Sequence, residues 1–260
     1  MILNKHQHFS FRSGKPKCEG TEESQMSVRK FVREGIERLI GKRLYLRLRI
    51  GMQEDNSYLR RTRGVIHIGA NDGQERDLYA AFGLNVIWVE PIPEIFESLK
   101  QNISKFPEQR AFNCLVMGED GQKYEFHIAN NAGASSSVLD FSKHKEMWPE
   151  ITYTNTITIQ GITLGTLLET ENIDIRRYDV LVLDTQGSEH NILVGAGNLL
   201  ANFKFVKVEV PDFESYKGCC QIGELSEFML SHGFREFRRL PFMHVSRVGT
   251  YFDMIYTKVR

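Results

Sequence analysis

One stretch of the chain, residues 64–91, constrains the fold more than any other. Its first apolar run, Val65–Ile68, stops at the small-residue turn Gly69–Gly73, and its second run, Val86–Glu90, ends on a carboxylate. Beyond the carboxyl ends of parallel strands, such a turn lets the backbone approach a nucleotide-like ligand, and the acid can bind both hydroxyls of a ribose. The stretch therefore predicts a cofactor site.

Strand-like and helix-like patterns alternate from residue 64 onward. We expect buried strands at Val65–Ile68, Val86–Glu90, Ala111–Val116, Val180–Asp184 and Phe205–Val210. Helices are expected at Gln74–Phe82, Pro93–Lys105, Glu189–Leu200 and Ile222–His232. Residues 123–129 and 154–160 alternate like edge strands around a polar loop, and Phe234–Arg239 with Tyr251–Thr257 predict a hairpin. This alternation favours a doubly wound α/β sheet.

The first 63 residues differ from the rest in charge. They carry 15 Lys/Arg and 7 Asp/Glu, a net charge of +8 in a chain whose total is zero. Residues 1–25 are polar and expected to be loose, and Ser27–Ile40 has helical spacing. Arg43–Ile50 alternates like a strand, although a basic helix would also fit. We expect a basic leader or helical cap at 1–63 and one domain at 64–260. Such a leader could contact an anionic membrane or polymer, or it could be a solvated helix with basic flanks.

The four cysteines, Cys18, Cys114, Cys219 and Cys220, form neither a spaced disulfide framework nor a metal-binding pattern. We expect free thiols, which favour a cytoplasmic protein. The polar amino-terminal residues predict no secretory signal, and the sequence has no apolar run long enough to predict a membrane span. No metal and no nucleic-acid partner is expected.

The turn itself narrows the choice of cofactor. A dinucleotide fingerprint reads G-x-G-x-x-G and places pyrophosphate on a helix N-terminus, whereas here three residues separate Gly69 from Gly73. Asp72 would also bring a negative charge toward a phosphate. A cofactor with an amino acid tail and no phosphate, such as S-adenosylmethionine, fits better. Glu90 lies 21 residues after Gly69, where a ribose-binding acid is expected, although it could instead cap the following helix.

Four stretches in order resemble the FkbM-type S-adenosylmethionine-dependent methyltransferases. They are the turn His67–Gln74 with Trp88–Pro91, the serine-rich loop Asn130–Ser137, the segment Leu183–Glu189, and the strand Lys207–Val210. The resemblance covers residues 64–257. It implies a Rossmann-like class I methyltransferase fold with a seven-stranded, mostly parallel sheet, helices on both faces and an antiparallel last strand. It also implies methylation of a hydroxyl on a sugar, a glycan or another small hydroxylated metabolite.

The resemblance also implies which residues meet the cofactor. These are His67, Gly69, Ala70, Asn71, Asp72, Gly73, Glu90, Pro91, Asn113, Leu115 and Asp184. One position departs from the usual pattern, because many methyltransferases have an acid on the first strand where this chain has His67. Asp72 or Asp184 could then supply the charge that holds the cofactor's amino group.

The acceptor end is less defined by sequence. Asp184 and Glu189 are the candidate catalytic bases, although either acid could simply stabilise a helix start, and His190 is more typical of a surface residue. Ser135, Ser136, Gln186 and Glu209 are candidate substrate contacts. Two other functions fit the pattern less well. These are a nicotinamide-dependent oxidoreductase on a similar sheet and a binding module that has kept the fold without catalysis.

Overall fold

The computed structural model describes residues 54–259, all within one compact unit of the chain, Leu46–Arg260. The predicted leader helix and strand lie outside the described residues. The strands are β1 Gly64–Ile68, β2 Asn85–Val89, β3 Gln109–Phe112, β4 Leu115–Val116, β5 Lys123–Ala129, β6 Tyr153–Ile162, β7 Val180–Leu183, β8 Phe205–Pro211, β9 Phe234–Val245 and β10 Gly249–Lys258. The helices are η1 Glu54–Arg61, α3 Arg76–Phe82, α4 Pro93–Ile103, α5 His144–Met147, α6 Leu164–Thr170, η2 Ile175–Arg177, α7 Glu189–Ala196, η3 Gly197–Asn202 and α8 Ile222–Ser231.

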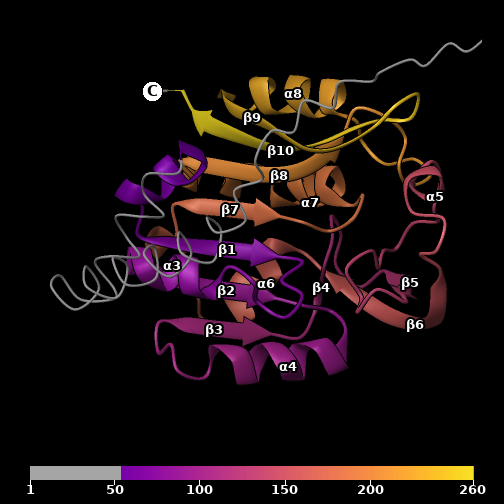
Figure 1. Ribbon diagram of the computed structural model, residues 1–260. Helices are drawn as coiled ribbons and strands as arrows, with labels where there is room; N and C mark the ends of the chain where they lie inside the picture. The colour runs from indigo at the N-terminus through magenta and orange to yellow at the C-terminus, as the bar shows by residue number, and fades with distance from the viewer. Residues whose placement is uncertain (1–53, 260) are drawn as a thin grey trace, which may run out of the picture. The chain divides into compact units, whose positions relative to one another are not determined.

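A seven-stranded sheet forms the centre of the described residues, in the order β3-β2-β1-β7-β8-β10-β9. The strands from β3 to β8 pair in parallel, and β10 pairs antiparallel with both β8 and β9. The arrowheads of β1, β2, β3 and β7 point the same way in Figure 1. The sheet confirms the expected α/β class, with its last strand antiparallel. It also brings the carboxyl ends of β1, β2, β7 and β8 to one edge.

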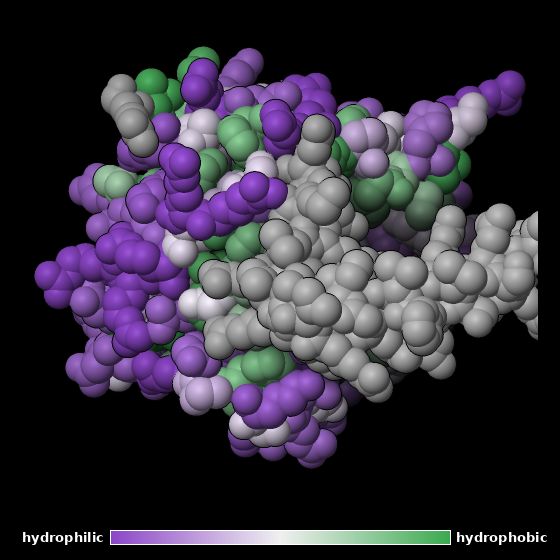
Figure 2. Space-filling model, turned by 60° about the vertical axis from the view of Figure 1, so that its left-hand side comes forward, coloured by the Kyte–Doolittle hydropathy of each residue, from purple (hydrophilic) through white to green (hydrophobic). Residues whose placement is uncertain are grey.

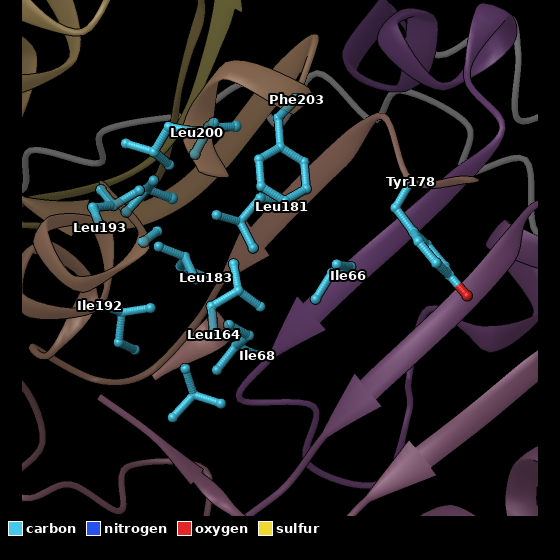
Figure 3. Close-up of a cluster of buried hydrophobic side chains, with 14 of the residues drawn as sticks. Ile66, Ile68, Leu164, Tyr178, Leu181, Leu183, Ile192, Leu193, Leu200 and Phe203 are labelled. Atoms are coloured by element: carbon cyan, nitrogen blue, oxygen red, sulfur yellow. The ribbon is translucent and has the colours of Figure 1, made fainter. Parts of the chain in front are cut away.

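Helices cover both faces of this sheet because its inner strands are apolar on both faces. One face packs against α6, α7 and α8, where Leu164, Leu193 and Met229 are fully buried against Ile66, Leu181 and other strand residues (Figure 3). The other face packs against α3 and α4 through Tyr79, Phe82, Leu99 and Ile103. The segment before β1 belongs to this second core, since Tyr58 and Leu59 are buried in it.

The expected third strand divides into two. β3 pairs with β2, whereas β4 leaves the main sheet and joins β6 and β5 in a separate three-stranded sheet. Asn113, between them, donates its side-chain amide to the carbonyl oxygens of Glu90 (2.8 Å) and Pro91 (3.1 Å). These bonds fix the chain where it turns away, so the continuous strand Ala111–Val116 was a wrong prediction.

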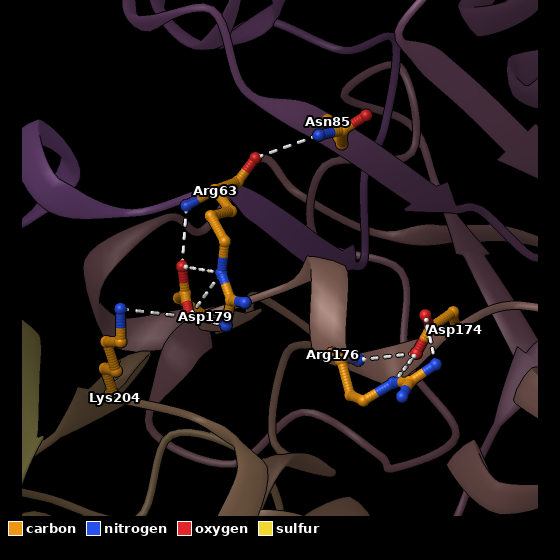
Figure 4. Close-up of polar contacts among 6 residues, drawn as sticks. All are labelled: Arg63, Asn85, Asp174, Arg176, Asp179 and Lys204. Carbon is orange, nitrogen blue, oxygen red and sulfur yellow. Dashed lines mark hydrogen bonds and ion pairs between the residues drawn. The ribbon is translucent and has the colours of Figure 1, made fainter.

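The amino-terminal edge of the sheet is fastened by Asp179, whose carboxylate is fully buried. It accepts from the backbone N–H and the guanidinium of Arg63 (both at 2.6 Å) and lies 3.3 Å from the Lys204 ammonium (Figure 4). Burial alone would raise the pKa of Asp179, but the bonds from Arg63 and Lys204 outweigh it and lower the pKa.

On the face in Figure 2, hydrophilic side chains dominate the described surface, with smaller apolar areas between them.

Candidate active site

A cavity of about 670 Å³, partly open to solvent, lies at the carboxyl edge of the sheet. Its lining comes from the ends of β1, β2 and β7 and from the segments around β4 and the serine-rich loop. The lining residues are Ile68, Gly69, Asn71, Gln74, Val89, Glu90, Pro91, Ile92, Cys114, Leu115, Val116, Phe126, Gly133, Ala134, Ser136, Asp184, Thr185, Gln186 and Ser188.

The turn after β1 places backbone against the end of β7. Gly69 has φ of 82°, and a Cβ at this position would lie only 1.8 Å from the carbonyl oxygen of Asp184. The backbone N–H groups of Gly69 and Ala70 both donate to the carbonyl oxygen of Val89 at 3.0 Å. A residue with a side chain cannot occupy this position without moving β7, which explains the glycine that opens the motif.

Glu90 lies at the end of β2, and only 4% of it is exposed. One carboxylate oxygen accepts from the backbone N–H of Asn71 (2.9 Å), and the other accepts from that of Ile92 (2.9 Å). Burial raises the pKa of Glu90 to about 7, with the nearby Asp184 contributing, although these two hydrogen bonds act in the opposite direction. Each oxygen has a further lone pair, so the carboxylate can accept bonds from two ligand hydroxyls.

The charge of the cavity distinguishes between cofactors. Among the described residues that line it, Glu90 and Asp184 are acidic and none is Lys, Arg or His. The two acids would repel the negative charge of a pyrophosphate, and no cation is there to offset the repulsion. The same acids would attract a positively charged sulfonium compound. These residues fit S-adenosylmethionine. Glu90 would accept from the ribose hydroxyls, and the turn at Gly69 and Asn71 would lie against the amino acid tail. Ile92, Leu115 and Phe126 would offer apolar surface to the adenine.

Not every residue predicted for the cofactor lines this cavity. Gly69, Asn71, Glu90, Pro91, Leu115 and Asp184 do, whereas His67, Ala70, Asp72, Gly73 and Asn113 do not. Gly73 faces α4, where an added Cβ would lie 2.7 Å from a methyl group of Leu99. Asp72 receives a bond from Asn102 at its backbone carbonyl, and its own Oδ1 is buried without a partner. Gly73 and Asp72 therefore pack the turn against α4 and do not face the cavity.

His67, which the resemblance places at the cofactor, is a core residue. Its ring stacks on Trp88 with 5.0 Å between ring centroids, and its Nδ1 lies 3.1 Å from the hydroxyl of Tyr79. Burial lowers the pKa of His67 to about 3, with the positive charge of Lys207 adding to the effect. The imidazole is therefore neutral at neutral pH. It lies on the sheet face that packs against α3, so its position does not support a contact with the cofactor.

The segment after β7 turns sharply and brings the Gln186 side chain against three other polar side chains. Gln186 has φ of 54° and Gly187 has φ of 108°, both in the left-handed region. The amide nitrogen of Gln186 donates to Asp184 Oδ1 (2.8 Å) and to Glu209 Oε1 (3.2 Å), and its amide oxygen accepts from the Tyr216 hydroxyl (2.7 Å). Burial raises the pKa of Asp184 to about 6 and that of Glu209 well above its ordinary value.

Glu189 has a different position from the one expected of a catalytic base. Its carboxylate accepts from the backbone N–H groups of Thr185 (2.9 Å) and Gly187 (3.0 Å) and from the Thr185 hydroxyl (3.1 Å). The residue is buried and does not line the cavity. Burial raises the pKa of Glu189 to about 6 against the effect of these bonds. The geometry makes Glu189 the residue that holds the turn closed.

Of the three serines in the serine-rich loop, one lines the cavity and two bond to the residues around it. Ser136 lines the cavity, and its hydroxyl accepts from the backbone N–H of Ala129 at 3.0 Å. The Ser135 hydroxyl accepts from the side-chain amide of Asn131 (3.0 Å) and lies 3.1 Å from Nε2 of buried His144. The Ser137 hydroxyl donates to the carbonyl oxygen of Gln186 (2.7 Å) and so links the loop to the β7 turn.

Sequence reasoning missed several contributors to the site, among them Phe126 and Tyr216. Phe126, on β5, supplies apolar surface to the cavity, although β5 had been read only as an edge strand. Tyr216 reaches Gln186 from a loop with no helical or strand period, so no sequence signal could have found it. Cys114 also lines the cavity, but burial raises the pKa of its thiol to about 12, and it stays protonated.

Comparison with known proteins identifies the family. The model of the methyltransferase FkbM domain matches residues 67–236. The chain therefore belongs to the FkbM family of methyltransferases, which confirms the resemblance of its four motifs, and its sheet is the class I methyltransferase fold. A curated relative, the 2-O-methyltransferase NoeI of Sinorhizobium fredii (strain NBRC 101917 / NGR234), is 22% identical over 162 residues. That match spans 59% of this chain and 65% of the relative.

Solved methyltransferase structures are also similar to the chain. The 1,6-didemethyltoxoflavin-N1-methyltransferase of Burkholderia thailandensis, solved with 1,6-didemethyltoxoflavin and S-adenosylhomocysteine, is 13% identical with a TM-score of 0.44. That comparison covers 97% of this chain and 99% of the other. The METTL16 MTase domain is 12% identical with a TM-score of 0.46, over 85% of this chain and 68% of the other.

In the part of the chain described, no helix has the length and apolarity needed to span a membrane.

Proposed function

We propose that this chain transfers the methyl group of S-adenosylmethionine to a hydroxyl of a sugar, a glycan or another small hydroxylated metabolite. The observation that carries the proposal is the acidic, cation-free lining of the cavity, in which buried Glu90 stands at the end of β2 and Asp184 at the end of β7. The relative described as a 2-O-methyltransferase supports oxygen as the acceptor atom.

Each end of the cavity has its own role in this proposal. Glu90 accepts hydrogen bonds from the ribose hydroxyls, and Asn71 and the backbone at Gly69 face the amino acid tail. At the other end, Ser136 and Gln186 line the cavity and contact the acceptor. Glu209 accepts from the Gln186 amide, and Ser135 is bonded to His144 within the same loop region.

The rate of methyl transfer depends mainly on how the acceptor hydroxyl is positioned. When bound, the cofactor supplies an electrophilic methyl group, so the carbon–oxygen bond forms as the carbon–sulfur bond breaks and its electron pair stays on sulfur. Holding the hydroxyl in line with that bond supplies most of the rate. The Asp184 carboxylate then takes the hydroxyl proton. A base whose pKa is raised to about 6 is still largely ionised at neutral pH and holds the proton better than an ordinary aspartate.

A screen with methyl-labelled S-adenosylmethionine tests the reaction. Purified full-length chain is incubated with panels of glycans and small hydroxylated metabolites, and the label is followed into products. We expect label on an oxygen of at least one acceptor, and much slower transfer by Asp184→Asn. Label found only on nitrogen or carbon acceptors would contradict the proposal. The exposed variant Glu125→Gln is the control for the loss of a carboxylate.

A further inference from the structure

Two carboxyl groups at the carboxyl edge of the sheet share one hydrogen-bond donor. The side-chain nitrogen of Gln186 lies 2.8 Å from an oxygen of Asp184 and 3.2 Å from an oxygen of Glu209. The two carboxyl oxygens are therefore within about 6 Å of each other, at the ends of neighbouring strands β7 and β8. Both residues are half-buried. Like charges this close and partly shielded from water do not both ionise at their ordinary pKa.

The orientation of the shared amide is set by a third residue. Tyr216, only 2% exposed, donates its hydroxyl to the amide oxygen of Gln186 at 2.7 Å. With the oxygen held there, the –NH₂ group must face the two acids. The backbone of Gln186 is also fixed, because its carbonyl oxygen accepts from Ser137.

The surrounding charges leave the pair with an excess of negative charge. Glu189 on α7 and Asp253 on β10 act on Glu209, and Glu75 and Asp253 act on Asp184. Lys207 on β8 is the cation that acts on Asp184, but its ammonium is 2.9 Å from the Asp253 carboxylate. Lys207 is thus already paired, and it does not neutralise Asp184 and Glu209 together.

We propose that Asp184 and Glu209 act as one unit that retains a proton. The sulfonium charge of the cofactor expels this proton on binding, and Tyr216 positions the unit through Gln186. This inference rests on the proposed function, since it needs S-adenosylmethionine in the cavity. When the methyl group leaves, the sulfur becomes neutral, and the affinity of the unit for a proton rises again. The proton lost by the acceptor hydroxyl then moves to the Asp184–Glu209 unit, and it passes to solvent when the products leave.

Proton release on binding tests the inference. S-adenosylmethionine and S-adenosylhomocysteine, which lacks the sulfonium charge, are titrated calorimetrically into the full chain at pH 6.0 in buffers of different ionisation enthalpy. The α-amino groups of both compounds are protonated at this pH. Any proton released at Glu90 is common to both. We expect S-adenosylmethionine to release more protons than S-adenosylhomocysteine, because only the sulfonium charge lowers the affinity of the unit for its proton.

Three variants assign the released proton. Glu209→Gln should abolish the difference between the two compounds, Tyr216→Phe should reduce it, and the exposed control Glu125→Gln should leave it unchanged. The wild-type chain also gives a test that needs no variant. The infrared difference spectrum between the two complexes at pH 6.0 should show a carboxylic acid C=O band that is weaker with S-adenosylmethionine.

Distinct results overturn the two proposals. Equal proton release by both compounds, or a difference that survives Glu209→Gln, would overturn the shared proton. An unchanged difference in Tyr216→Phe would overturn the positioning role of that tyrosine. If neither compound binds, the proposed function itself is wrong.

Discussion

At the scale of single residues, Glu90 is the side chain whose replacement should affect cofactor binding most directly. Glu90→Gln removes a charged acceptor from the ribose hydroxyls while keeping the shape of the side chain. We expect it to weaken S-adenosylhomocysteine binding by about 1–3 kcal/mol at pH 8, measured by calorimetry. Glu94→Gln, an exposed glutamate in the first turn of α4, is the matched control and should bind as the wild type does.

The same residue predicts a pH dependence. Ligand hydroxyls donate to Glu90, so its ionised form binds better, and its pKa in the free protein is raised to about 7. Binding by the wild type should therefore strengthen as the pH rises from 6 to 8, and this contribution should be missing from Glu90→Gln. An equal pH dependence in both proteins would contradict the assignment of Glu90 to the ribose.

His67 should affect stability rather than binding. The pKa of His67 is about 3 in the folded chain and near 6.5 in the unfolded chain, so its contribution to the free energy of unfolding is complete above pH 6.5 and is lost as the pH falls. Lowering the pH from 7 to 5 should therefore reduce the free energy of unfolding of the wild type by about 2 kcal/mol through this histidine. His67→Phe should escape that loss in urea denaturation at the two pH values, with S-adenosylhomocysteine affinity unchanged. A constant difference between the two proteins at both pH values would be the contrary result.

Sequence could predict those parts of the site that depend on strand ends. Glu90, Asp184 and Gly69 follow buried apolar runs, and a parallel sheet must bring such positions together. Sequence could not tell which face of the sheet His67 joins, because β1 is buried on both faces and carries no alternation. Nor could it show that Glu189 bonds to the loop preceding it, since an acid at a helix start has the same pattern in either role.

At the scale of elements, helix α6 forms because its side chains pack against the sheet, although its local sequence pattern did not predict a helix. This seven-residue helix was not predicted, and Leu164 and Leu167 hold it against the sheet. Leu164→Ala should lower the free energy of unfolding by about 2–5 kcal/mol, because it leaves a cavity in a fully buried site. Leu230→Ala, on α8 and 67% exposed, should change it by less than about 0.5 kcal/mol. Urea denaturation of both variants measures the contrast, and similar losses would contradict this core.

Most of the sheet was predictable because its strands are continuous apolar runs between turn residues. The division between β3 and β4 was not, since it depends on bonds from Asn113 to the carbonyl oxygens of Glu90 and Pro91. Those acceptors lie more than twenty residues away in sequence. A local pattern cannot contain such a contact.

At the scale of the whole domain, the Asp179 contacts tie the segment before β1 to the start of β7 and to Lys204 before β8. The pKa of Asp179 is lowered in the folded chain, so its stabilisation is present above about pH 4 and is lost as the pH falls below it. Asp179→Asn should lower the free energy of unfolding at pH 7 by about 1–3 kcal/mol, measured in urea. Asp174→Asn, which breaks the exposed pair with Arg176, should change it little. Equal effects of the two variants would contradict a special role for Asp179.

The central claim concerns the cavity as a whole, and binding of S-adenosylhomocysteine to the full-length chain tests it most directly. Isothermal titration calorimetry should show one compound bound per chain in the micromolar range, with a rise in the unfolding temperature. The absence of both binding heat and any thermal shift would contradict the assignment of this cavity to S-adenosylmethionine.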